Sequence, residues 1–289
     1  MDKVDAINSF DITVQPFTIQ GMIDAAQEGE VVLVPPGTYN EHVLIDKTIT
    51  LRGTDKNTTT ITYTSSEENP YAPINGKGKE IFPGFFGKGP PFTVENLTII
   101  NNSIHPDGGG GSYWYYDGGV SLWDCQDTKI DNCIFKDSPC GVIVYVGNAE
   151  VINCEFYGCA DEGVAFTDSI DNKVAHCNFH DNAMDIELQA ASVETNALIE
   201  YCTFTNTSSC IAGIHALPKT IIVNNCTFAL TLSPLQIANY GTSIFTNCSL
   251  PDTGIVSISN HSTAEFVCCD TTNIYWDVDE TSSYTTHCP

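Results

Sequence analysis

The sequence predicts an all-β solenoid, in which the chain winds as stacked coils around a shared core. The main evidence is a phrase that recurs with Cys and Phe two residues apart, at Cys133/Phe135, Cys154/Phe156, Cys177/Phe179, Cys202/Phe204 and Cys226/Phe228. Weaker copies follow around Cys248 and Cys268. Successive cysteines are about 20 to 25 residues apart, a period typical of stacked repeats. Residues two apart on a strand point to the same side, so we expect each coil to send one Cys and one Phe into the core.

Length and composition agree with one continuous solenoid. The chain has 289 residues with 42% hydrophobic content, which is too apolar for a disordered chain. Because each coil of a solenoid contacts only its neighbours, we predict a single domain over residues 1–289. The sequence contains no run of about 18 apolar residues, so we expect no membrane span.

The N-terminal portion predicts a cap. Thr18 is suited to begin a short helix over Ile19–Gln27, with Ile19, Met22, Ile23 and Ala26 on one face and Gly29 at its end. An open solenoid end exposes apolar side chains and unpaired backbone groups. We therefore expect residues 1–30 to cover one end, and the tail over 275–289 to cover the other.

The cap is followed by the predicted strands 31–34, 43–45 and 49–53, with a turn over Pro35–Tyr39. The whole stretch, TIQGMIDAAQEGEVVLVPPGTYNEHVLIDKTITLRG, resembles the opening of right-handed parallel β-helix proteins of the pectin-lyase-like superfamily. The resemblance implies a right-handed parallel β-helix with a short N-terminal capping helix. None of the catalytic sets of that superfamily transfers residue by residue. Arg52, the only arginine, follows an early strand, whereas the pectate lyases that this fold resembles use an arginine base with calcium.

From Gly119 onward, each coil is predicted to add a second strand. We expect these strands at 120–123, 142–145, 164–167, 186–189, 214–217 and 255–258, with alternate residues inward. Inward positions include Val120, Leu122, Val142, Val144, Val164, Phe166, Ile186, Leu188 and Ile214. Asn132, Asn153, Asn225 and Asn247 fall at one corner, where we expect a stacked amide ladder. Residues 65–92 and 103–117 interrupt the coil rhythm and are predicted to be inserted loops.

The outward side of these second strands is the predicted site. Trp123 and Tyr145 would lie one rung apart, able to stack on sugar rings, with Tyr115 from an inserted loop as a wall. Glu187, Asp185 and His215 are the candidate catalytic residues, because a carboxylate beside an imidazole suits general acid–base work. Gln189, Asp161 and Glu162 are the further candidates for binding the substrate.

The charge balance limits the partners. The chain has 36 acidic and 11 basic residues, a net charge of −25, which argues against nucleic acid because phosphate binding needs clustered Lys and Arg. It also counts against a polyanionic sugar unless calcium bridges the two. We expect no cofactor, with Ca²⁺ among Asp161, Glu162 and Asp185 as an alternative.

The thirteen cysteines leave the redox compartment open. We expect mostly free thiols in the ladder, since parallel neighbours rarely give the disulfide dihedral; one bridge among Cys140, Cys159 and Cys210 remains an alternative. No signal peptide is visible at the N-terminus, so the protein stays inside the cell or the chain begins after cleavage. Of these we expect an extracellular or cell-surface location.

The functional prediction is a carbohydrate-active protein that binds a polysaccharide along an outward groove. If it is an enzyme, we expect a polysaccharide hydrolase rather than a lyase, using carboxylate and histidine acid–base chemistry. The alternative is a non-catalytic surface, filament or scaffold protein whose inserted loops contact a protein partner.

Overall fold

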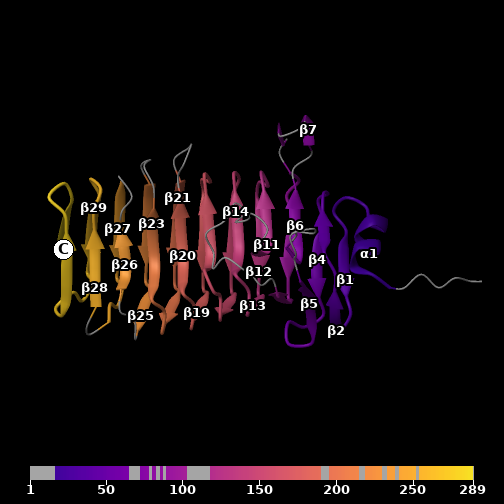
Figure 1. The fold of residues 1–289 in the computed structure, drawn as a ribbon, viewed down its shortest axis with the longest axis horizontal. Coiled ribbons are helices and arrows are strands. Elements are labelled where there is room, and N and C mark those ends of the chain that lie inside the picture. Colours follow the sequence, from indigo (N-terminus) through magenta and orange to yellow (C-terminus); the bar gives the residue numbers. More distant parts are fainter. Residues whose placement is uncertain are drawn as a thin grey trace, which may run out of the picture.

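The chain forms a rod-shaped parallel β-solenoid with a short helix at its N-terminal end, as predicted (Figure 1). The computed structural model describes residues 17–64, 72–77, 80–82, 85–86, 89–102, 118–189, 195–214, 219–229, 233–237, 241–251 and 254–288. Tyr115 and His215 lie outside these residues, as does the whole insertion 103–117. Residues of consecutive coils pair in parallel register, so equivalent positions form columns along the rod.

Three sheets run along the rod, whereas the sequence predicted two strands per coil. Sheet A has 11 strands: β1 (Val31–Val34), β4 (Thr50–Gly53), β9 (Thr93–Glu95), β12 (Thr128–Asp131), β15 (Ala149–Ile152), β18 (Asn172–Ala175), β21 (Thr195–Glu200), β24 (Lys219–Asn224), β27 (Thr242–Thr246), β29 (Thr263–Val267) and β31 (Ser283–His287). Sheet B has 8 strands: β2 (Gly37–Asn40), β5 (Thr59–Tyr63), β10 (Thr98–Asn101), β13 (Ile134–Lys136), β16 (Glu155–Tyr157), β19 (Asn178–His180), β22 (Thr203–Thr205) and β25 (Thr227–Ala229).

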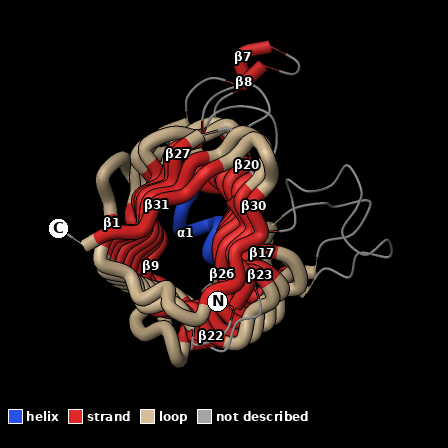
Figure 2. Tube along the Cα trace, turned by 90° about the vertical axis from the view of Figure 1, so that its left-hand side faces the viewer, coloured by secondary structure: helices blue, strands red, loops and turns tan. Residues whose placement is uncertain are grey.

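Sheet C contains the predicted site. Its 10 strands are β3 (Val43–Ile45), β6 (Ile74–Lys77), β11 (Gly118–Trp123), β14 (Cys140–Tyr145), β17 (Glu162–Thr167), β20 (Met184–Gln189), β23 (Ser209–Ile214), β26 (Ser233–Ile237), β28 (Gly254–Ile258) and β30 (Ile274–Val278). A separate antiparallel pair, β7 (Glu80–Phe82) and β8 (Phe85–Phe86), lies apart from the three sheets (Figures 1 and 2). The described part of the predicted insertion 65–92 therefore contains a rung of sheet C as well as this pair.

The N-terminal helix α1 (Ile19–Ala25) closes one end of the core, as Figure 2 shows along the rod. The Thr18 hydroxyl accepts a hydrogen bond from the Gly21 amide at 3.0 Å, which confirms Thr18 as the residue that caps the helix. Ile19 and Ile23 are fully buried against the first coil. The predicted turn after this region was partly wrong, because Gly37–Asn40 forms β2.

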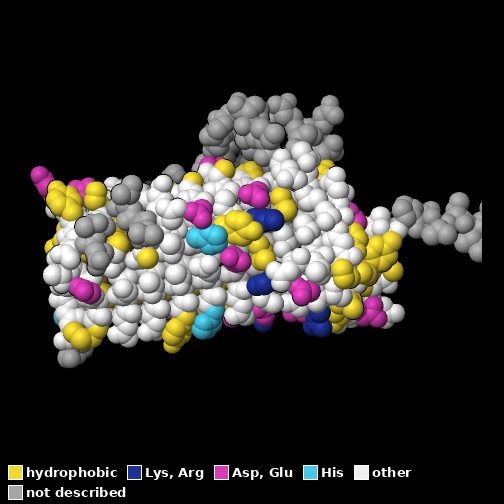
Figure 3. All heavy atoms as spheres, turned by 90° about the horizontal axis from the view of Figure 1, so that it is seen from below, with side chains coloured by type: hydrophobic (Ala, Val, Ile, Leu, Met, Phe, Trp, Pro, Cys, Tyr) yellow, Lys and Arg dark blue, Asp and Glu magenta, His cyan; other side chains and the backbone are white. Residues whose placement is uncertain are grey.

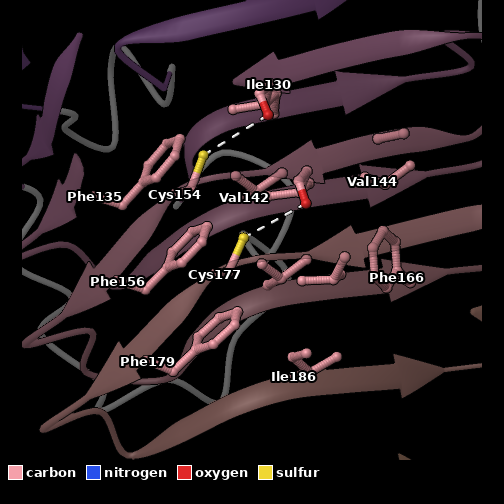
Figure 4. Close-up of a cluster of buried hydrophobic side chains, with 14 of the residues drawn as sticks. Ile130, Phe135, Val142, Val144, Cys154, Phe156, Phe166, Cys177, Phe179 and Ile186 are labelled. Atoms are coloured by element: carbon pink, nitrogen blue, oxygen red, sulfur yellow. Dashed lines mark hydrogen bonds between the residues drawn. The ribbon is translucent and has the colours of Figure 1, made fainter. Parts of the chain in front are cut away.

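The Cys and Phe columns form the predicted core ladder. The Phe135, Phe156 and Phe179 rings stack with centroids 4.8 and 4.7 Å apart (Figure 4). Each cysteine beside them points its sulfur at a backbone carbonyl; the Cys154 Sγ lies 3.7 Å from the Ile130 oxygen. The ladder thiols are free and mostly buried, as predicted. Cys140, Cys159 and Cys210 form no disulfide, so the alternative of a bridge among them is not realised.

The asparagine corner is explained by backbone conformation. Asn132, Asn153, Asn225 and Asn247 have φ between 53° and 56°, the left-handed region that Asn tolerates better than most residues. The Asn132 amide donates to Asn96 at 2.8 Å and that of Asn247 to Asn225 at 3.5 Å, but Asn153 donates to Asp131 instead. The amide ladder is thus confirmed only in segments.

The C-terminal end corrects one cysteine assignment. Cys269, not Cys268, continues the ladder, since its sulfur accepts a hydrogen bond from the Cys248 amide at 3.3 Å. Cys268 takes the corner position at φ 53° and forms a disulfide with Cys288. This disulfide ties the last strand, β31, to the coil before it.

Candidate functional site

The outward side of sheet C, over β11, β14, β17 and β20, is the candidate site. The predicted inward residues of these four strands are all fully buried in the core: Val120, Leu122, Val142, Val144, Val164, Phe166, Ile186 and Leu188. The strands approach the Phe stack closely at a glycine column, where a Cβ on Gly141 would lie 2.7 Å from the Phe156 ring. This close approach fixes which side of each strand faces outward.

An aromatic pair lies at one edge of this face. Trp123 and Tyr145 are direct neighbours in the register of β11 and β14, as predicted. Their ring centroids are 5.1 Å apart and the rings are inclined by 52°. Both side chains are half-buried. Because the rings are inclined, they do not cover each other's faces as the parallel core phenylalanines do.

Two rungs further along, β20 contributes Glu187 and Gln189. Gln189 continues the column of Trp123 and Tyr145 through Thr167. Its side-chain amide donates a hydrogen bond to the Glu187 carboxylate at 2.5 Å. Glu187 is only 2% exposed although it lies on the outward side. The hydrogen bond orients a carboxylate that faces away from the core.

Glu162, on the neighbouring strand β17, forms an electrostatic pair with Glu187. Burial, followed by the negative charges of Glu187 and Asp161, raises the pKa of Glu162 to about 8, although a hydrogen bond with the Cys140 thiol acts in the opposite direction. Glu162 is therefore largely protonated at neutral pH beside a second carboxyl group. Pairs of carboxyl groups whose environments separate their pKa values are suited to acid and base roles.

Small side chains surround this pair. Cys140, Ile143 and Ala165 form a buried apolar cluster separate from the main core. The Ser121 hydroxyl, in the column of Glu187, and the Ser209 hydroxyl, in the column of Glu162, are buried. Among the described residues neither hydroxyl has a hydrogen-bond partner.

Asp185 does not join this pair, although it was predicted to be catalytic with Glu187. It is fully buried and occupies the register position of the glycine column. Its Oδ1 accepts hydrogen bonds from Asn182 at 2.9 Å and Thr207 at 3.0 Å, both in the corner between sheets B and C. Burial raises its pKa to about 7. The structure thus places Asp185 inside the wall of the solenoid.

The register of β23 differs from the predicted one. Glu187 pairs with Ala212 and Gln189 with Ile214, and Ile211, not Ile214, follows Ile186 in the core. The strand was predicted at 214–217, three residues too late. The expected adjacency of His215 and Glu187 is therefore not supported by the register, while His215 and Tyr115 themselves lie outside the described residues.

A second polar cluster lies on sheet B and was not predicted from the sequence. His180 contacts Asp181 at 2.9 Å and Glu155 at 3.3 Å, and its ring stacks on Tyr157 with centroids 5.0 Å apart. Figure 3 shows acidic side chains gathered around a histidine near the middle of this face. Aligning the phrases Glu155-Phe156-Tyr157 and Asn178-Phe179-His180 could have revealed it, since the residues flanking each Phe face outward.

The His180 cluster is a less suitable reaction centre than the sheet C pair. Burial lowers the pKa of His180, but hydrogen bonds to Asp181 and Glu155 outweigh it and raise the pKa. Both ring nitrogens are engaged, so the imidazolium acts as a link between coils. Among the described residues, no group of three His, Cys, Asp or Glu side chains is arranged to hold a metal ion, and no helix is long and apolar enough to cross a membrane.

Comparison with known proteins places the fold. A crystal structure of the pectate lyase Pel9A matches with a TM-score of 0.58 and 12% identity, covering 93% of this chain and 73% of that one. A family 28 exopolygalacturonase from Yersinia enterocolitica matches with a TM-score of 0.50 and 10% identity, covering 93% and 74%. A pectin methylesterase from carrot has a TM-score of 0.48 and 13% identity, covering 93% and 83%.

At these low identities the similarity shows only the fold, which carbohydrate-active enzymes also use; it does not show an activity or a substrate. No curated protein matches the chain. The model of the right-handed β-helix region matches residues 92–274, which include the four strands of the candidate site. The chain therefore belongs to the right-handed β-helix family.

Proposed function

We propose that the protein binds a polysaccharide along the outward face of sheet C and hydrolyses it by acid–base catalysis between Glu162 and Glu187. The observation that carries the proposal is the elevated pKa of Glu162, about 8, caused by burial and by the neighbouring Glu187 carboxylate. The two carboxyl groups supply a proton donor and a proton acceptor on the adjacent strands β17 and β20, beside the aromatic pair Trp123 and Tyr145.

The roles follow from the two environments. Glu162, protonated at neutral pH, donates its proton to the glycosidic oxygen as the bond to the leaving sugar breaks. Glu187, held by Gln189, is the carboxylate that activates water or attacks the sugar carbon; the separation of the carboxyl groups in the complex decides which. Trp123 and Tyr145 provide apolar ring surface for a neighbouring sugar.

The test measures soluble oligosaccharide released from a panel of neutral and charged polysaccharides. We expect Glu162→Gln and Glu187→Gln each to lower kcat by about 10²- to 10⁴-fold, the usual contribution of one acid–base group. Trp123→Ala should raise KM with a smaller effect on kcat. Activity of the native protein should fall as pH rises above about 8, because Glu162 then loses its proton.

The matched control is Glu150→Gln on sheet A, whose carboxylate lies 3.8 Å from Lys173 and away from this face. Product release that survives both Gln variants unchanged would refute the catalytic pair.

The alternative function is a non-catalytic scaffold. The observation in its favour is the β7–β8 pair, which stands clear of the three sheets (Figure 1). Such a protein would bind none of the polysaccharides. It would instead retain a protein partner that is lost when residues 78–88 are replaced by a short Gly-Ser linker.

A further inference from the structure

We propose that the outward face of sheet B binds a neutral, extended polysaccharide and holds it without cleaving it. This inference goes beyond the function proposed above and does not depend on the carboxyl pair of sheet C. It is carried by two ring stacks on the surface and by the backbone conformation of one of them. We name this surface the sheet B platform; it consists of His176, Tyr201, Tyr157, His180, Asn178 and Thr203.

The corner that precedes sheet B departs from its asparagine pattern in two coils. Between Asn153 and Asn225, the same corner position holds His176 and Tyr201, both at φ 55°. The left-handed region is favoured by Asn and His, but a bulky side chain such as Tyr is an outlier there. Such a conformation costs free energy and is most often retained at functional positions. Tyr201 is therefore a candidate for a role other than stability.

Tyr201 is exposed and stacks on a single ring. The Tyr201 and His176 rings have centroids 5.0 Å apart and planes inclined by 4°. Tyr201 is 53% exposed, and the next coil places Asn225 at this corner instead of a third ring. Within the part of the chain that the structure describes, no other ring lies against Tyr201 and its hydroxyl makes no hydrogen bond. Such a ring offers apolar surface to a sugar and a polar group beside it.

A second stack lies at the other end of the same strands. The Tyr157 and His180 rings have centroids 5.0 Å apart and planes inclined by 10°. His176 and His180 are four residues apart in the sequence, which is at most about 13 Å of extended chain. Figure 3 shows two histidines on this face, one near its middle and one near its lower edge. The two stacks can therefore contact different units of one extended polysaccharide chain.

The side chains between the two stacks are polar and uncharged. Asn178 on β19 pairs in register with Thr203 on β22, and both are exposed. An amide and a hydroxyl both donate and accept hydrogen bonds, so they match the hydroxyl groups of a sugar. Glucans and xylans of the cellulose type are extended and present apolar C–H faces between their hydroxyls. They combine the two kinds of group that the platform can bind.

The charges near the second stack favour a neutral ligand. Lys136 precedes Tyr157 in register, whereas Asp181 and Glu155 contact His180 at 2.9 and 3.3 Å. Charges of both signs therefore lie near the same stack. An anionic or a cationic polymer would meet a like charge there as well as an opposite one, and a neutral chain avoids this repulsion.

The experiment measures binding of cello-oligosaccharides and xylo-oligosaccharides of equal length by calorimetric titration. Tyr201→Asn and Tyr157→Thr each replace a ring by a residue that the same column carries in another coil, at Asn225 and Thr205. We expect each to weaken binding about three- to tenfold, the usual contribution of one stacked ring. The titrations are repeated with Trp123→Ala as a second substitution, so that any binding on sheet C is reduced and the remaining binding reports on the platform.

Two further variants and a stability measurement separate a binding role from a structural one. Tyr201→Phe keeps the ring and should keep the affinity within about twofold. Tyr275→Asn removes a tyrosine that is 67% exposed on β30 and should leave binding unchanged. Tyr201→Asn relieves an unfavourable backbone conformation, so the melting temperature should stay the same or rise. Weaker binding with undiminished stability is a result that a merely structural tyrosine would not give.

The outcomes distinguish this inference from the proposed hydrolase. Binding that depends on Tyr201, without any release of product by the native protein, supports the platform and overturns the hydrolase. Product release that Glu187→Gln abolishes, with binding unaffected by Tyr201→Asn, overturns the platform and leaves the hydrolase standing. A melting temperature that falls together with binding in Tyr201→Asn assigns a structural role and overturns the platform. The absence of binding to either probe overturns it as well.

Discussion

The interior and the outward side of the same coils differ in whether one residue type repeats from coil to coil. Inside, one column repeats Phe at Phe135, Phe156, Phe179, Phe204 and Phe228, each at most 1% exposed. On the outward side of sheet C, one column reads Ser121, Ile143, Ala165, Glu187 and Ala212. In-register stacking favours identical aromatic rings in the interior, but it places no such demand on the outward face. The interior column therefore keeps one residue type from coil to coil, whereas the outward column does not.

The largest expected effect is the loss of one interior ring. Phe179→Ala leaves a cavity between the Phe156 and Phe204 rings, which stack on it from both sides. We expect it to lower the free energy of unfolding by about 3–5 kcal/mol, measured by denaturant titration. The exposed neighbour Asn178→Ala, as control, should change it by about 0.5 kcal/mol at most. Similar small effects for both would contradict the view that the repeated column provides the stability.

The next effect concerns the end of the solenoid. Cys268→Ser removes a disulfide that closes a separation of 20 residues, for which a loss of about 3 kcal/mol is typical. Because coils contact only their neighbours, the loss should be confined to β31 and the strand beside it. Hydrogen exchange should then be faster in β31 but unchanged in β19. Equally fast exchange along the whole rod would show that the end is not an independent unit.

The next effect concerns Asp185, which is fully buried at the register position that glycine occupies in the preceding coil. Its pKa in the folded protein, about 7, is raised above the ordinary value of 3.8 by burial. The folded state therefore holds the proton more tightly, and this contribution to stability is present at acid pH and lost as pH rises through about 7. We expect Asp185→Asn to reduce the decline in stability between pH 4 and 8 by an amount on the order of 2 kcal/mol. Parallel pH profiles for the two proteins would contradict this.

The smallest effect concerns the outward face of sheet B. The pKa of His180 is raised by Asp181 and Glu155, so its ionic contribution is present at acid pH and lost as pH rises through the folded-state pKa. We expect His180→Gln to lower stability by about 0.5–1 kcal/mol at pH 5 and by less at pH 8, measured by thermal unfolding. His176→Gln, which removes an imidazole stacked on Tyr201, is the control for the loss of a stacked ring.

Part of the site could be predicted from the repeat. The spacing between phrases is enough to align Trp123 with Tyr145 and to set Glu187 and Gln189 on the outward side. It failed at β23, where the strand was predicted three residues too late, although Ile211 follows Phe204 at the same spacing at which Ile186 follows Phe179. The partnership of Glu162 with Glu187 was also missed, since it crosses two strands at an offset that alternation within one strand does not reveal.

The sequence by itself determined the solenoid, its N-terminal cap and the Cys and Phe ladder. These features arise from side chains repeated at one spacing, whose burial depends on local alternation and on identical neighbours. Only the tertiary structure decided which carboxylates share an environment and that Cys268 pairs with Cys288. It also decided that Asp185 lies inside the wall and that, within the described part of the chain, the Ser121 and Ser209 hydroxyls lack hydrogen-bond partners. Charge, burial and hydrogen bonding at these positions depend on contacts between coils, and such contacts are set by register rather than by any single segment of the chain.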